Sequence, residues 1–321
     1  MNNNSSTELE LDRPEFIPEI FGPQDVNIKL IEKKFNARIV ARGSKVLING
    51  DPEICRRVSK LLCDLQGLIE AGSPLKTEDV KFAVRLAWEE PEVDLNSIFS
   101  ERIQVAPAKG FIYAKGSTQK ELIRAVKEAD IVMAVGPAGT GKTYLAVALA
   151  VEGLLKRKYK RIILVRPAVE AGEKLGFLPG DMIEKINPYI MPLYDALNNM
   201  MDVGQVRGLI EEGVIEIAPL AYMRGRTLND SFIILDEAQN STRQQMKMFL
   251  TRLGFRSKMI VTGDVTQIDL PHQTDSGLLH AKKLLSTVEG IRFVAFNEKD
   301  VVRHELVKKI ISAYDAESSK D

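Results

Sequence analysis

The residues with the clearest chemical potential are glycines, a lysine and a threonine that occur together at a fixed spacing. They form the pattern G-x-x-x-x-G-K-T between positions 136 and 143. In this pattern, small residues let consecutive backbone N–H groups turn inward, which makes a cradle for phosphate groups. The sequence therefore predicts a phosphate-binding loop for a nucleotide, made of Gly136, Pro137, Ala138, Gly139, Thr140, Gly141, Lys142 and Thr143.

The sequence on either side of the loop supports this prediction. The apolar run 130–135 indicates a buried strand, and the segment 144–158 is rich in helix formers. The phosphates of ATP would then lie at a helix N-terminus, where backbone N–H groups and the helix dipole favour negative charge. Lys142 would reach the β- and γ-phosphates, and the Thr143 hydroxyl would bind Mg²⁺. The alternative, a glycine-rich turn with no ligand, does not account for the complete strand–loop–helix context.

Two carboxylates follow a second strand-like run, in the segment FIILDEAQN (232–240). Asp236 is expected to hold Mg²⁺ together with Thr143, and Glu237 is expected to activate the attacking water as general base. An acidic helix start is the alternative for this segment alone. Together with the loop, the second carboxylate favours hydrolysis over simple nucleotide binding.

Further polar candidates lie in two other segments. In VTGDVTQIDLP (261–271), Asp264 could support the water shell of the metal and Gln267 could contact the γ-phosphate, although a turn with a capping aspartate is the alternative. Gln119, in a predicted helix before the loop, could bind the adenine base. A glutamine that only faces solvent on the helix surface is nearly as good an explanation.

The elements that must position these residues begin at Asp130. Apolar strand-like runs alternate there with helical segments, which predicts an α/β domain with a parallel sheet and helices on both faces. Ligands in such sheets lie beyond the C-terminal ends of the strands, where the motifs fall. The runs occupy residues 131–135, 161–165, 214–218, 232–236, 258–263 and 291–296.

The motifs GKT, DEAQ and GDxxQ together resemble the ATPase cores of superfamily 1 helicases, which are P-loop nucleoside triphosphatases of RecA type. Such helicases carry two cores, whereas the residues after 130 suffice for one. An arginine that completes the site would therefore come from a neighbouring copy in a homo-oligomeric ring. The candidates for this arginine are Arg224, Arg226 and Arg303. The alternative for each is an arginine on the surface that is simply solvated. Arg166 is expected near the nucleotide site or near a path for nucleic acid.

The N-terminal part has a different pattern. Residues 1–15 are predicted to be a disordered tail, 16–72 an α+β domain, 73–104 a connector and 105–321 the ATPase domain. The α+β domain resembles the K-homology (KH) fold, whose loop has the form I-x-G-x-x-G-x-x-I. Ile20, Gly22 and Ile28 match this loop, but Asp25 replaces its second glycine, and an acidic residue disfavours contact with phosphates. RNA binding and a structural or protein-docking role both remain open for this domain.

Composition limits the remaining function classes. Among 321 residues, Lys+Arg and Asp+Glu balance at 44 each, so net charge argues neither for nor against a nucleic-acid partner. No apolar run approaches the roughly 20 residues that cross a bilayer, so no membrane association and a cytoplasmic location are expected. Cys55 and Cys63 are expected to be buried thiols, and neither they nor the three histidines have a metal-binding spacing.

The assembled motifs resemble the PhoH family of bacterial ATPases. The match includes residues 166–181, 219–240 and 300–307 besides the loop. The resemblance implies ATP binding and hydrolysis and a role in RNA metabolism. Our leading hypothesis is an ATPase that remodels or processes RNA, with a nuclease or a ribosome-associated protein as partner. The alternatives are a nucleotide-switched adaptor with slow hydrolysis and a kinase, which Glu237 disfavours because it suits the activation of water.

Overall fold

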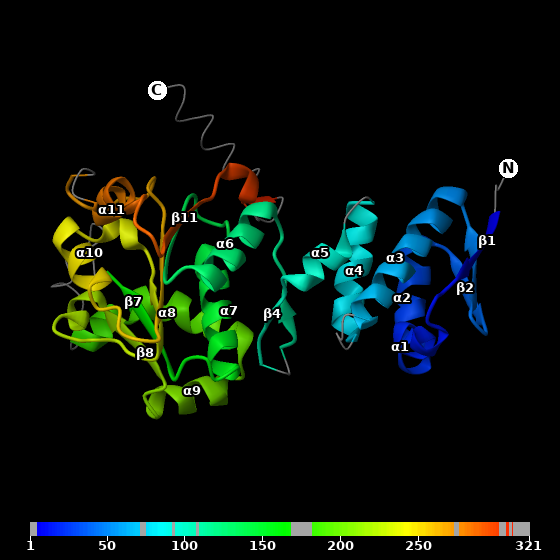
Figure 1. Ribbon diagram of the computed structural model, residues 1–321, viewed down its shortest axis with the longest axis horizontal. Coiled ribbons are helices and arrows are strands. Elements are labelled where there is room, and N and C mark those ends of the chain that lie inside the picture. The colour runs from blue at the N-terminus through cyan, green and yellow to red at the C-terminus, as the bar shows by residue number, and fades with distance from the viewer. Residues whose placement is uncertain are drawn as a thin grey trace, which may run out of the picture. The chain divides into compact units, whose positions relative to one another are not determined.

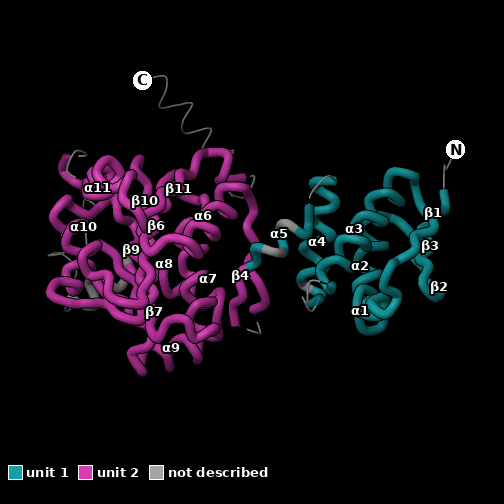
Figure 2. Tube along the Cα trace, viewed as in Figure 1, with its two compact units in different colours: residues 1–102 teal, residues 103–321 magenta. Residues whose placement is uncertain are grey.

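The computed structural model divides the chain into two compact units, Met1–Arg102 and Ile103–Asp321 (Figure 2). The structure describes residues 5–70, 75–91, 94–106, 109–167, 182–272, 276–301, 306–307 and 310. Within these ranges, no helix combines the length and the apolar character needed to cross a membrane.

The first unit is built on a three-stranded antiparallel sheet in the order β1-β3-β2. Its hairpin turns at Gly43 and Ser44, where Gly43 has a φ of 63° that favours glycine. The helix α3 packs on β1 and β3 and buries Leu61 and Leu65. The elements are β1 (Ser5–Glu10), α1 (Ile17–Phe21), α2 (Val26–Phe35), β2 (Arg38–Arg42), β3 (Lys45–Gly50), α3 (Pro52–Glu70), α4 (Thr77–Glu89) and α5 (Leu95–Ser100).

The prediction of a disordered tail over residues 1–15 is wrong for β1. This strand pairs with β3, with Thr7 opposite Ile48 and Leu9 opposite Val46. Its side chains alternate between half-buried and exposed, a pattern of period two that the polar composition concealed. Because the pairing partner lies about 40 residues away in the chain, local composition could not reveal the strand.

The segment 73–104, predicted as a connector, contributes helices to the first unit. The helix α4 packs on α2 and α3, and it buries Val80 and Ala83 completely. The expectation of two buried thiols is correct for Cys55 and wrong for Cys63, which is exposed.

The loop between α1 and α2 has a left-handed backbone at both positions that the KH-like pattern assigns to glycine. Gly22 has a φ of 74°, and Asp25 adopts a φ of 60° at the position of the second glycine. Aspartate is one of the few residues with a side chain that visits this left-handed region. The replacement therefore changes the charge of the loop without removing its backbone turn.

The second unit contains a six-stranded sheet in the order β11-β6-β10-β9-β7-β8, and every neighbouring pair is parallel. The strands β6, β9 and β10 are buried at every position, as expected for a sheet covered on both faces. The predicted α/β fold is thus confirmed. The strands are β6 (Ile131–Val135), β7 (Arg161–Arg166), β8 (Ile215–Pro219), β9 (Ser231–Leu235), β10 (Lys258–Gly263) and β11 (Ile291–Ala295), and a short ribbon adds β4 (Ile103–Gln104) and β5 (Phe111–Ile112).

Helices cover both faces of this sheet (Figure 1). A hydrophobic core on each face holds them to the sheet. Alternate residues of each strand enter alternate cores, so that Val132 of β6 packs in the first and Met133 in the second. The first core includes α6 (Ser117–Glu128), α7 (Lys142–Leu155), α8 (Met182–Met200) and α9 (Val203–Glu211). The second core includes α10 (Arg243–Leu250) and α11 (Gly277–Leu285).

Candidate nucleotide-binding site

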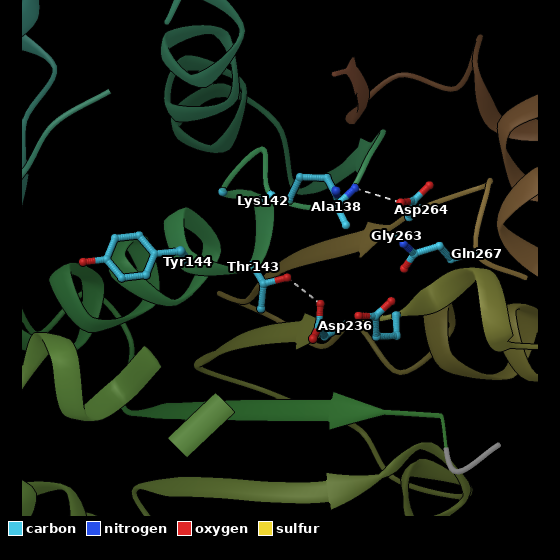
Figure 3. Close-up of a pocket in the computed structure, with 11 residues that line it drawn as sticks. Ala138, Lys142, Thr143, Tyr144, Asp236, Gly263, Asp264 and Gln267 are labelled. Atoms are coloured by element: carbon cyan, nitrogen blue, oxygen red, sulfur yellow. Dashed lines mark hydrogen bonds between the residues drawn. The ribbon is translucent and has the colours of Figure 1, made fainter. Parts of the chain in front are cut away.

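The functional side chains meet where three neighbouring strands end. The strand β10 lies between β6 and β9, and all three are parallel, so the segments that follow them lie at one edge of the sheet. A cavity of about 240 Å³ opens there (Figure 3). Among the residues that line it are Lys142, Thr143, Asp236, Glu237, Asp264 and Gln267.

The loop after β6 depends on glycine for conformation and for space. Gly139 and Gly141 have φ values of 80° and 83°, which side chains rarely adopt. A Cβ atom on Gly136 would lie 2.4 Å from the carbonyl oxygen of Phe296. The helix α7 begins at Lys142, so the loop delivers its N–H groups to a helix N-terminus as the sequence predicts.

The Lys142 ammonium group is buried inside the loop. Its Nζ atom donates hydrogen bonds to the carbonyl oxygens of Gly136 and Pro137, both at 2.7 Å. Burial lowers the pKa of Lys142, and the nearby carboxylates of Asp264 and Glu237 oppose that shift in part. The phosphates of a nucleotide would provide the negative charge that this ammonium group needs.

Thr143 and Asp236 form a set of oxygen atoms suited to a hard cation. The Thr143 hydroxyl donates to Oδ1 of Asp236 at 2.6 Å (Figure 3), and the Thr262 hydroxyl donates to the same atom at 2.7 Å. Asp236 is 3% exposed, so its charge acts in a poorly solvated place. Hydroxyl and carboxylate oxygens are the ligands that Mg²⁺ takes beside nucleotide phosphates, so these two residues fit the expected ion.

Glu237 occupies a strained position that its neighbours maintain. Its φ of 52° is left-handed, a conformation that costs about 1–2 kcal/mol for a residue with a side chain. Oε1 accepts a hydrogen bond from Nη2 of Arg166 at 2.9 Å, and Oε2 accepts one from Nε2 of Gln239 at 2.7 Å. Backbone strain of this kind clusters at functional sites.

Arg166 bridges the two carboxylates that follow β9. Besides its bond to Glu237, its Nε atom lies 3.3 Å from Oδ2 of Asp236. The sequence predicted Arg166 near the site or a nucleic-acid track, but it did not indicate this bridge. The available signal was its place at the end of β7, because β7 neighbours β9 in the sheet.

Gln239 is a second residue whose role the sequence did not reveal. Its Oε1 atom accepts from the backbone N–H of Asp264 at 2.9 Å, and its Nε2 atom donates to the carbonyl oxygen of Gln267 at 3.0 Å. With its bond to Glu237, these contacts tie the end of β9 to the end of β10. The buried amide therefore sets the relative positions of the two motifs.

Asp264 binds the loop itself. Its Oδ2 atom accepts from the backbone N–H of Ala138 at 2.8 Å (Figure 3), and its Oδ1 atom accepts from the backbone and hydroxyl groups of Thr266. The sequence suggested instead that Asp264 supports the water shell of a metal. Gln267 is exposed at the cavity, and its contact with a γ-phosphate stays a prediction.

Gln119 lies against the loop and is 5% exposed. Its Oε1 atom accepts from the backbone N–H of Lys115 at 2.7 Å, and its Nε2 atom donates to the carbonyl oxygen of Thr140 at 2.9 Å. Both ends of the amide thus brace the loop, and the described residues that line the cavity do not include Gln119. Contact with adenine stays a prediction.

The other arginine candidates lie in different environments. Arg226 forms a two-pronged ion pair with Glu216, with Nη2 and Oε2 2.7 Å apart, so its guanidinium is engaged within its own chain. Arg224 is exposed. Arg303 lies outside the described residues.

The sheet order, the loop after β6 and the carboxylates after β9 define a P-loop nucleoside triphosphatase of RecA type. Comparison with known sequences then gives the family. The profile described as "PhoH-like protein" matches residues 111–315, and the chain belongs to the PhoH family.

Relatives extend this match beyond the ATPase unit. The chain is 50% identical over 309 residues to the PhoH-like protein of Bacillus subtilis (strain 168), covering 96% of this chain and 97% of the relative. It is 47% identical to the PhoH-like protein of Mycobacterium tuberculosis (strain ATCC 25618 / H37Rv), covering 94% of this chain and 85% of the relative. Protein PhoH of Escherichia coli (strain K12) is 44% identical over 205 residues, which are 63% of this chain and 58% of that protein.

One solved structure to which part of the chain is similar is the Sulfolobus solfataricus SWI2/SNF2 ATPase core in complex with dsDNA. The two are 11% identical with a TM-score of 0.31, and the match covers 58% of this chain and 45% of that one. At this TM-score the similarity supports no inference about function.

Proposed function

We propose that the chain binds ATP together with Mg²⁺ and hydrolyses it to ADP and phosphate. The observation that carries this proposal is the 2.6 Å hydrogen bond between Thr143 and Asp236, in a cavity that Lys142 and Glu237 also line. This arrangement joins a phosphate-binding loop to a cation-binding pair and a carboxylate that can take a proton from water.

In the proposed reaction, the loop and Lys142 bind the phosphates. Lys142 exchanges its two carbonyl acceptors for oxygens of the β- and γ-phosphates. Thr143 and Asp236 would hold Mg²⁺, which neutralises charge on the phosphate oxygens when bound.

Glu237 provides the base. Its side chain is 38% exposed, so water can reach the carboxylate at the cavity. Glu237 accepts a proton from water as the water oxygen bonds to the γ-phosphorus, and the bond from that phosphorus to the β–γ bridging oxygen breaks. Arg166 holds Glu237 and Asp236 in place through its contacts with both carboxylates.

We propose further that this hydrolysis is coupled to RNA. The KH-like pattern of the first unit supports the coupling, because Ile20, Gly22 and Ile28 match the loop with which KH domains bind RNA. A nuclease or a ribosome-associated protein would then use the remodelled RNA.

One feature favours the second candidate, a nucleotide-switched adaptor. Lys142 and the Ala138 N–H are already satisfied by partners within the chain, and a nucleotide must displace these contacts. Because these contacts must break before a nucleotide is bound, association would be slow and would limit the rate of each cycle.

The test is steady-state ATP hydrolysis by the full chain with and without single-stranded and structured RNA. Strong stimulation by RNA that disappears in Glu237→Gln supports the coupled ATPase. Hydrolysis that does not respond to RNA supports the adaptor. Labelled phosphate on an acceptor other than water would show a kinase and refute both.

We also propose that a neighbouring copy of the chain supplies the arginine that completes the site. In a head-to-tail ring, exposed Arg224 of one copy would reach the γ-phosphate of the next. Mixing Arg224→Ala with Lys142→Ala should then restore some hydrolysis, because mixed rings pair an intact site with an intact arginine. A mixture that stays inactive contradicts this arrangement.

A further inference from the structure

The first unit contains a groove between α2 and α4 that the nucleotide site does not use. The two helices pack together (Figure 1), and a cavity of about 450 Å³ runs between them. It is lined by Leu30, Lys33 and Lys34 of α2 and by Lys81, Val84 and Arg85 of α4. Residues three and four apart on a helix share one face, so each helix presents its basic residues to the same groove.

The groove concentrates positive charge because four of its lining side chains are cationic, whereas two acidic residues of the same helices bind backbone groups. Glu32 of α2 accepts a hydrogen bond from the backbone N–H of Ile39 on β2 at 2.7 Å. Asp79 of α4 accepts one from the backbone N–H of Lys76 at the start of its own helix. None of the described residues that line the groove is acidic. The local charge therefore attracts a polyanion although the whole chain is neutral.

An aromatic ring stands at one end of this basic groove. Trp88 follows Val84 and Arg85 by one helical turn and is 40% exposed. Its ring packs edge-on against Phe35 with centroids 5.4 Å apart, and Lys34 Nζ lies 5.3 Å from the ring centroid. The indole is thus fixed by packing but accessible to solvent, and cations lie beside it. Bases of single-stranded nucleic acids stack on aromatic side chains in such surroundings.

We propose that the α2–α4 groove binds a single-stranded nucleic acid, with Lys33, Lys81 and Arg85 on the phosphates and Trp88 stacked on a base. An acidic peptide would satisfy the charges but has no bases for the indole. None of the residues that line the groove belongs to the loop that carries Asp25, so the acidic residue of that loop is not among the groove's contacts. The inference deepens the proposed coupling to RNA and rests on it for its biological use, but the binding itself needs no ATP.

The test uses the full chain without nucleotide. Trp88 is the one tryptophan in the sequence, so intrinsic fluorescence reports on the groove directly. Titration with a labelled oligouridylate should quench Trp88 at the same midpoint at which the anisotropy of the oligonucleotide rises. Trp88→Ala should weaken binding roughly fivefold or more, as measured by anisotropy.

A matched pair of double variants separates the groove from general charge. Lys33→Gln/Arg85→Gln should weaken binding about tenfold and reduce the slope of log affinity against log salt by about 1.4, the amount expected for two lost phosphate contacts. Lys45→Gln/Arg56→Gln removes the same charge from exposed positions on β3 and α3 and should change affinity by less than about twofold.

Three results would overturn the inference: equal affinity of the two double variants, oligouridylate binding that leaves Trp88 fluorescence unchanged, or polyglutamate binding as tight as that of the oligonucleotide. Hydrolysis without RNA should stay at the wild-type level in Lys33→Gln/Arg85→Gln. Lys142→Ala should lose hydrolysis and keep oligouridylate binding. If Lys142→Ala hydrolyses ATP normally, the proposed function fails while the groove stands.

Discussion

Replacing Glu237 by glutamine tests the proposed base with a minimal change of shape. Two donors converge on this side chain, Nη2 of Arg166 and Nε2 of Gln239, and each meets a different carboxylate oxygen. A glutamine has one acceptor oxygen and one amide nitrogen, so it can keep one of these bonds while the other donor faces an N–H group. The variant therefore loses the base, the charge and one hydrogen bond.

The structure sets the size of these losses. Loss of a positioned general base lowers the rate constant of hydrolysis by about 10²- to 10⁴-fold. The side chains of Arg166 and Glu237 are 15% and 38% exposed, so solvent screens their ion pair, and the stability cost is about 1 kcal/mol. For a unit of this size, that cost lowers the Tm by about 2–4 °C. ATP affinity should change little, because Lys142 and the loop are intact.

The assay compares phosphate release, equilibrium binding of a fluorescent ATP analogue and thermal unfolding. Glu216→Gln is the matched control, because Glu216 is a half-buried glutamate paired with Arg226 and does not line the cavity. The control should lose a similar amount of stability and keep wild-type hydrolysis. The reasoning about Glu237 is refuted if Glu237→Gln hydrolyses ATP within about threefold of the wild-type rate.

Three other substitutions test the residues that shape the nucleotide site and hold it in place. Because burial lowers the pKa of Lys142, the unfolded chain binds more protons there than the folded chain, and raising the pH from about 8 to 10 should raise the Tm of wild type relative to that of Lys142→Met. A wild-type Tm that falls relative to that of Lys142→Met over this range would contradict this sign. Arg166→Ala leaves the buried carboxylate of Asp236 without this cation, so it should cost about 1–3 kcal/mol and lower the Tm more than Glu237→Gln does, as thermal unfolding would show. Gly136→Ala should weaken ATP binding at least tenfold and lower the Tm, because its new Cβ atom would lie 2.4 Å from a carbonyl oxygen. Gly204→Ala is the control, because open space surrounds that position. It should leave ATP binding unchanged and either leave the Tm unchanged or raise it slightly. Equal behaviour of the two alanine variants would count against the steric argument.

The sequence predicted the features of this protein that depend on neighbouring residues. The spacing of glycines before Lys142 and Thr143 specifies the loop because consecutive N–H groups must converge on one phosphate. The apolar runs predicted all six strands of the parallel sheet, since strands covered on both faces are apolar throughout. Asp236 and Glu237 were recognisable because a carboxylate directly after a buried strand must emerge at the ligand edge.

Contacts between distant segments were decided by the tertiary structure alone. Arg166 and Glu237 are 71 positions apart, and they meet only because β7 and β9 are neighbours in the sheet. The strand β1 was hidden because its partner β3 lies far along the chain. The basic groove likewise exists only where α4 packs on α2. A local pattern specifies which element forms and which face it buries, but the partner of that face depends on the packing of the whole chain.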